Sequence, residues 1–376
     1  AMDSDASNYN VAVGYDAGAA VTTGVQNTLI GGLAGDALTD ATRNVAVGYL
    51  ALSTETSGYR NVAIGAEALA LANGGNYNTV IGDSAGENIT TADENTIIGG
   101  LAGDALTTGT RNVAIGYHAL GGEDAHGKNV AIGYQALKAQ DAGADAYNTA
   151  VGYSVGETMT TGISNTLIGA FAGDALTEGD YNVAIGRSAL SLEDAYGYNV
   201  AIGAFALLNQ NAADNAFNVA VGYNAGQAIT TGIQNVIMGG SAGDALTTGS
   251  KNVAIGHLAL SAEDAHGDNV AIGHSALTTL DAGASGLNCA VGYFAGESVT
   301  TGVKNTLIGA QAGDAITEGF NNIVVGYNAA ASAVDVDNEI TLGDANINAF
   351  RCADQSIAAL SDGRDKTDIK DSSYGL

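Results

Sequence analysis

A glycine recurs along almost the whole chain at a fixed spacing, and this column constrains the fold more than any other feature. It begins at Gly14 and ends at Gly343, in steps of 17 residues with three steps of 19, which defines 20 units. Asn stands four residues before the glycine in every unit except the last, where Glu339 replaces it. Such regularity is typical of an elongated repeat protein in which each unit packs only on its neighbours.

The glycine column decides between helical and β repeats. A period of 17 residues is half of a 34-residue helical hairpin, but Gly inside a helix costs about 1 kcal/mol relative to Ala. One such glycine per unit would oppose helices by about 20 kcal/mol, which exceeds the net stability of a typical domain. Segments such as Asn-Val-Ala-Ile-Gly at 129–133 instead read as short strands, and Thr, Asp and Gly at the following turns fit this reading. We predict an all-β fold, a parallel β-solenoid (β-roll or β-helix) of about 20 coils with a 17-residue repeat.

The asparagine column has a structural explanation in such a fold. Stacked coils place identical side chains about 4.8 Å apart, so the amides can hydrogen-bond along the stack as a ladder. The alternative is a line of ligand-binding amides. We predict the structural ladder, represented by six residues of the column: Asn27, Asn44, Asn112, Asn129, Asn182 and Asn199.

A longer period is superimposed on the first. Units of the type Asn-Thr-Leu-Ile-Gly recur at every fourth position, which gives a super-repeat of about 70 residues. Each 19-residue step falls in the fourth unit of a super-repeat, and we expect its additional residues to form a loop on one side of the rod.

The strand segments indicate how the rods associate. In Asn-Val-Ala-Ile-Gly the Val and Ile face one side and the Ala faces the other. We expect the Ala to face outward, which would leave an apolar stripe exposed along the rod. Three rods packed Ala face to Ala face would cover this stripe, so we predict a homotrimeric rod. A monomeric solenoid or a dimer is the alternative.

The formal net charge of −28 argues against nucleic acid and anionic membranes as partners. No apolar run reaches the length of a transmembrane helix. We find no catalytic constellation and expect no enzyme activity, cofactor or metal site in the repeats. The histidines lack a consistent acidic or Cys partner and are interpreted as surface residues: His118, His126, His257, His266 and His274. Tyr follows the column glycine in eight units, where it could stack on sugars or pack across a subunit boundary.

The repeat dissolves after Gly343, and residues 361–370 read Ser-Asp-Gly-Arg-Asp-Lys-Thr-Asp-Ile-Lys. This run resembles the junction in phage tail fibres and tailspikes that carry a C-terminal intramolecular chaperone of the peptidase S74 type. In that family a Ser and a Lys five residues later form a self-cleaving dyad, and Ser361 and Lys366 match this spacing. The family's chaperone continues well beyond the motif, whereas ten residues follow Lys366, so we expect the dyad to be inactive in this chain. The coils are also similar to the heads of trimeric autotransporter adhesins.

These observations predict an N-terminal extension at 1–9, a solenoid at 10–337, a terminal β segment at 338–360 and the start of a truncated S74-like region at 361–376. The resemblance implies an extracellular phage tail fibre that binds a glycan or protein receptor on the host cell and other virion tail proteins. The alternative is a bacterial trimeric surface adhesin or an extracellular scaffold fibre.

Overall fold

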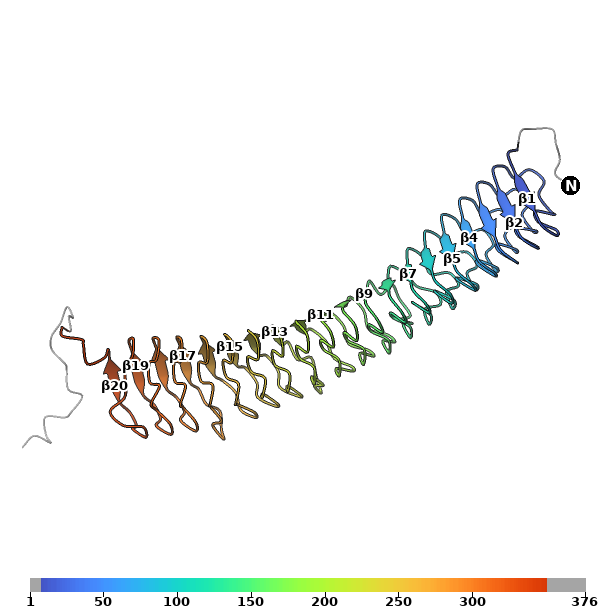
Figure 1. Ribbon diagram of the computed structural model, residues 1–376. Helices are drawn as coiled ribbons and strands as arrows, with labels where there is room; N and C mark the ends of the chain where they lie inside the picture. The colour runs from blue at the N-terminus through green and yellow to red at the C-terminus, as the bar shows by residue number, and fades with distance from the viewer. Residues whose placement is uncertain (1–7, 350–376) are drawn as a thin grey trace, which may run out of the picture.

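The computed structural model describes residues 8–349, which form one long, gently curved rod (Figure 1). Within these residues there is no helix, and each coil contributes one strand of three residues. The strands are β1 (Val11–Val13), β2 (Thr28–Ile30), β3 (Val45–Val47), β4 (Val62–Ile64), β5 (Thr79–Ile81), β6 (Thr96–Ile98), β7 (Val113–Ile115), β8 (Val130–Ile132), β9 (Thr149–Val151), β10 (Thr166–Ile168), β11 (Val183–Ile185), β12 (Val200–Ile202), β13 (Val219–Val221), β14 (Val236–Met238), β15 (Val253–Ile255), β16 (Val270–Ile272), β17 (Cys289–Val291), β18 (Thr306–Ile308), β19 (Ile323–Val325) and β20 (Ile340–Leu342).

Consecutive strands pair in parallel along the whole rod, so the predicted parallel β-solenoid of about 20 coils is confirmed. Val113 pairs with Val130 across a 17-residue step, and Val130 pairs with Thr149 across a 19-residue step. The strand register is therefore the same in both kinds of coil. The additional residues of the long steps lie in loops that begin at Asp141, Asn211 and Asp281. These three residues still donate a backbone hydrogen bond to the next coil, and the backbone leaves the hydrogen-bonded stack at 142–145, 212–215 and 282–285.

The close approach of neighbouring coils explains the glycine column. Gly48 has a φ of +143°, and a Cβ atom at this position would lie 2.1 Å from the carbonyl oxygen of Gly65 in the next coil. No side chain fits at that distance, and only Gly adopts this backbone conformation without strain. The column therefore allows the backbones to stack at this corner.

The interior of the rod is narrow, and it determines which strand face points inward. In β2 to β19 the middle residue of each strand is fully buried, whereas the first and third residues are half-buried or exposed. The prediction that Ala faces outward is therefore wrong. Ala46 points into the core because the interior of a 17-residue coil is also filled by Leu52 from the next corner, and a small residue on the strand leaves room for it.

The need to fill the narrow interior also explains why some units of the super-repeat carry a large residue where others carry a small one. Where the middle strand residue is large, as at Leu29, the position six residues later is Gly35. A Cβ atom on Gly35 would lie 2.8 Å from a terminal carbon of Leu29. Where the strand carries Ala46, the corresponding position carries Leu52. Large and small residues thus exchange places between these coils. In other units both positions are small, as at Ala150 and Gly156, where Leu137 and Leu167 of the neighbouring coils lie against the glycine.

Candidate functional site

The asparagine side chains are buried and bound to the backbones of neighbouring coils. The Oδ1 atom of Asn27 accepts a hydrogen bond from the backbone N–H of Asn44 at 3.0 Å, and its Nδ2 donates to the carbonyl of Ala41 at 2.8 Å. Asn44, Asn112 and Asn182 make the same pair of bonds. At Asn129 and Asn199 only the Oδ1 bond is present. These amides connect the coils and are not accessible to a ligand.

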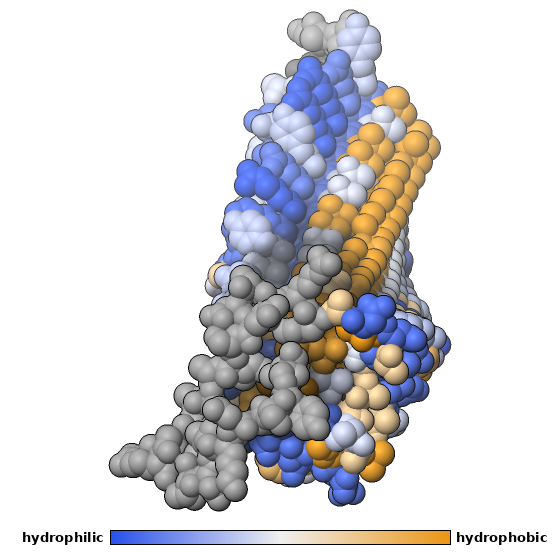
Figure 2. All heavy atoms as spheres, turned by 90° about the vertical axis from the view of Figure 1, so that its left-hand side faces the viewer, coloured by the Kyte–Doolittle hydropathy of each residue, from blue (hydrophilic) through white to orange (hydrophobic). Residues whose placement is uncertain are grey.

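The outward residues of the strands form an apolar face along the rod, called the strand face below. The third strand position is most often Ile or Val, and the first is most often Val or Thr. Ile30 is 40% exposed and Met238 is 41% exposed. Figure 2 shows a continuous hydrophobic band along one side of the rod, next to a hydrophilic one. A contiguous apolar face that runs along a rod is a candidate interaction surface.

Aromatic stacks lie at both ends of the strands, on either side of the strand face. Tyr117, Tyr134 and Tyr153 follow the column glycine, and their ring centroids are 5.7 Å and 5.0 Å apart in nearly parallel planes. A second stack precedes the column asparagine and consists of Tyr181, Tyr198 and Phe217. Within a stack the faces of the rings cover one another, so a sugar could reach only ring edges or the faces at the ends. This arrangement favours packing across a subunit boundary over sugar binding.

Two clusters lie beneath long loops of the rod, and each consists of three carboxylates and one imidazole. The ligand-type atoms of each cluster lie within 4.8 Å of one another. We call them the His126 cluster, made of Glu123, Asp124, His126 and Asp141, and the His266 cluster, made of Glu263, Asp264, His266 and Asp281.

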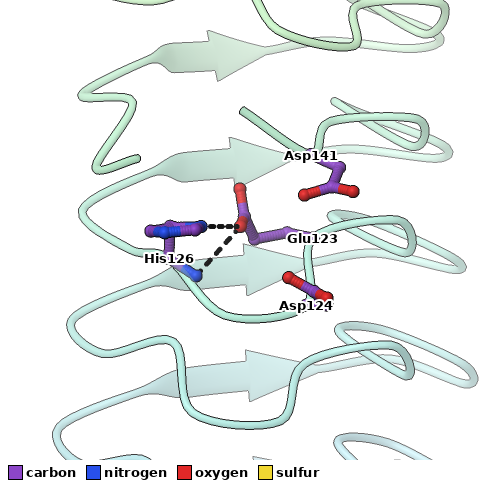
Figure 3. A group of neighbouring side chains, drawn as sticks. All are labelled: Glu123, Asp124, His126 and Asp141. Carbon is purple, nitrogen blue, oxygen red and sulfur yellow. Dashed lines mark hydrogen bonds and ion pairs between the residues drawn. The ribbon is translucent and has the colours of Figure 1, made fainter. Parts of the chain in front are cut away.

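Glu123 anchors the His126 cluster, and Figure 3 shows its carboxylate between His126 and Asp141. The side chain of Glu123 is fully buried, and its Oε1 accepts the backbone N–H of His126 at 3.0 Å. The Nδ1 atom of His126 lies 3.7 Å from the same oxygen. The Oε2 atom of Glu123 is buried without a hydrogen-bond partner. Burial raises the pKa of Glu123 to about 7, although the His126 backbone N–H opposes this rise.

The sequence prediction missed these clusters, because it found no consistent acidic partner for the histidines. The signal was present as Glu-Asp-Ala-His at 123–126 and again at 263–266. In both places an Asp at the start of a long loop follows the His by 15 residues. The loop belongs to the next coil, so Asp141 and His126 become neighbours only when the coils stack.

The predicted self-cleaving pair, Ser361 and Lys366, lies outside the described residues, as do residues 350–360 of the predicted terminal β segment. Among residues 8–349 no helix is long and apolar enough to cross a membrane. No family model matches the chain, and a search of the curated proteins finds no match either.

Proposed function

We propose that this protein is a structural adhesion fibre in which several copies pack side by side through the strand face, and that the assembly is a homotrimer. The observation that carries the proposal is the apolar strand face, which is continuous along the rod and has aromatic stacks on both sides. Monomeric soluble proteins rarely expose contiguous apolar patches larger than a few hundred Å².

A small cyclic assembly suits this geometry. Each rod carries the same face along its whole length, so copies in register bring equivalent residues together at every coil. Three rods around one axis would cover each strand face with the other two and leave the acidic and polar sides in water. With the strand faces covered, receptor contacts would lie on the loops and corners of the coils or at an end of the fibre.

We assign the fibre to the tail of a phage virion, an extracellular location where it would bind a host cell-surface glycan or protein and other tail proteins. The support is the resemblance of residues 361–370 to the S74-type junction, in which Ser361 and Lys366 hold the positions of the dyad. The rival assignment is a bacterial trimeric adhesin or extracellular scaffold fibre, which the similarity of the coils to autotransporter adhesin heads supports.

Native mass spectrometry tests the assembly. The expected mass is that of three chains. Ile115→Asp combined with Ile132→Asp places two charges per chain on the strand face, and we expect at least a tenfold rise in the concentration needed for assembly. Leu71→Asp combined with Leu192→Asp is the matched control, because both leucines are exposed but lie outside the strands. A monomeric wild-type protein, or equal effects of the two pairs, would contradict the proposal.

The assignment to a phage fibre has its own test. A longer chain that continues beyond Leu376 with an S74-type domain should be processed to a product that ends near Ser361, as measured by intact mass. Ser361→Ala should abolish this processing, because the nucleophile is removed. Unchanged processing of Ser361→Ala would rule out the dyad and favour the adhesin or scaffold assignment.

A further inference from the structure

We propose that the His126 cluster and the His266 cluster each bind one divalent transition-metal ion, with Zn²⁺ as the representative ion. This inference is independent of the proposed assembly, because all ligands of a site come from one chain. It adds two metal sites to a rod for which the sequence predicted none.

The geometry of the His126 cluster suits a single ion. One imidazole nitrogen and three carboxylate oxygens lie within 4.8 Å of one another. Zn²⁺ binds His nitrogen and carboxylate oxygen at about 2.0–2.2 Å in four-coordinate sites. Ligand atoms around such an ion are therefore about 3.5 Å apart, so small side-chain rotations would complete the shell. The exposed Asp124 and Asp141 form the entrance through which an ion can arrive.

A second observation points to a missing ligand. Glu123 is fully buried, yet its Oε2 has no hydrogen-bond partner, and neither does the buried Nδ1 of His126. A buried polar atom without a partner costs about 1–3 kcal/mol.

In the His266 cluster the buried Nδ1 of His266 also lacks a partner, whereas the Oε2 atom of Glu263 accepts the backbone N–H of Ala282 at 3.4 Å. The Oε2 atoms of Glu55 and Glu193 lack partners as well, so the unpartnered imidazole nitrogen beside the carboxylates is what sets the two clusters apart.

The super-repeat provides an internal comparison. The equivalents of Glu123, Asp124, His126 and Asp141 in the next super-repeat are Glu193, Asp194, Tyr196 and Asn211. The His and the loop Asp have both been replaced there, whereas both are present again in the His266 cluster. In the first super-repeat the equivalents are Glu55, Thr56, Gly58 and Asn73.

The buried glutamate has a structural role wherever it occurs. The Oε1 atom of Glu55 accepts the backbone N–H groups of Ser57, Gly58 and Gly74. Capping the turn therefore requires only the Glu. This capping role does not explain why both clusters with a His also have a carboxylate from the long loop, Asp141 in one and Asp281 in the other.

The donor set selects the kind of ion. Ca²⁺ takes six to eight oxygen ligands and Mg²⁺ also prefers oxygen, whereas an imidazole nitrogen favours Zn²⁺ and its transition-metal neighbours. Three ionised carboxylates carry a charge of −3, which outweighs the +2 charge of a divalent ion by one unit and so favours binding of a cation. Because Glu123 and His126 belong to one coil and Asp141 to the next, the ion would link adjacent coils and hold the long loop down.

Isothermal titration of the untagged, metal-free protein with Zn²⁺ tests the proposal, and we expect two ions per chain. The double variant His126→Tyr with Asp141→Asn should bind one ion per chain. Adding His266→Tyr and Asp281→Asn to this variant should abolish binding. These variants copy residues that the chain already carries at Tyr196 and Asn211, so they should fold. The reverse change, Tyr196→His with Asn211→Asp, should raise the number to three.

Competition with Ca²⁺ separates a specific site from general attraction to an acidic rod. A tenfold excess of Ca²⁺ over Zn²⁺ should leave the stoichiometry unchanged. Absence of Zn²⁺ binding, or a stoichiometry that none of the variants alters, would overturn the proposal. Displacement of Zn²⁺ by this excess of Ca²⁺ would overturn the assignment to a transition metal.

Discussion

Replacing Asn44 by Ala removes one member of the asparagine ladder and leaves two buried backbone groups without partners. The Oδ1 atom of Asn44 accepts the backbone N–H of Asn61 at 2.9 Å, and its Nδ2 donates to the carbonyl of Gly58 at 2.8 Å. Asn44 and Asn61 are fully buried, so water cannot take over either bond. An unsatisfied buried group costs about 1–3 kcal/mol. Two such groups should therefore lower the free energy of local unfolding at this site by about 2–6 kcal/mol.

Hydrogen exchange followed by mass spectrometry measures this loss locally. Each coil contacts only its neighbours, so the destabilisation should stay close to the substitution. A factor of ten in the opening equilibrium corresponds to about 1.4 kcal/mol, so amides in residues 44–78 should exchange about 30-fold to 2 × 10⁴-fold faster. Amides of β15 and β16, many coils away, should keep their wild-type rates.

Asn88→Ala is the matched control for this experiment. The Nδ2 atom of Asn88 also donates to a backbone carbonyl of the next coil, that of Asp104, at 2.7 Å. Asn88 is exposed, however, so water replaces the lost bond and the expected change is below about 0.5 kcal/mol. Equal exchange rates in the two variants would refute the argument that buried amides of the ladder stabilise the stack.

Two further predictions concern the corner glycines and the buried glutamates. Gly48→Ala should lower the thermal unfolding temperature far more than Gly143→Ala. Both glycines have a positive φ, but only Gly48 lies against a neighbouring backbone. Equal effects of the two substitutions would contradict the role given to the close approach of the backbones. Burial raises the pKa of Glu193 from 4.5 to about 7. Ionisation of this buried side chain therefore lowers the stability of the folded state by at most about 3 kcal/mol. The folded state holds this proton more tightly than the unfolded state, so stability should fall as pH rises from about 4.5 to 7 and then level off. Denaturant unfolding at pH 5 and pH 8 measures the loss of unfolding free energy between these pH values. This loss should be smaller in Glu193→Gln than in the wild type, and an equal loss in both proteins would contradict the assignment.

The fold could be predicted from the sequence because every coil repeats the same local chemistry. Glycine at 17-residue spacing excludes helices, and β-branched residues before it specify strands. The direction of the strand faces could not be predicted in the same way. Alternation in Val113, Ala114 and Ile115 defines two apolar faces, and the choice between them depends on how much space Leu120 takes in the interior.

The two clusters were missed for a different physical reason. Glu123 and His126 are close in sequence, but the third carboxylate, Asp141, arrives from a loop of the next coil. That contact depends on where the two additional residues of a 19-residue step are placed. The spacing alone does not specify this placement, whereas stacking in constant strand register does.

The reactivity of Cys289 tests most directly whether copies of the rod cover the strand face. Cys289 is the first residue of β17, half-buried on the strand face of a single chain, and a Cys352→Ser background leaves it as the only thiol. The measurement is the rate at which a bulky maleimide labels the native protein. If the strand faces pack against one another, labelling should be at least a hundredfold slower than in the denatured protein and should speed up when Ile115→Asp and Ile132→Asp weaken assembly. Labelling of the native protein within a few-fold of the denatured rate would contradict the account.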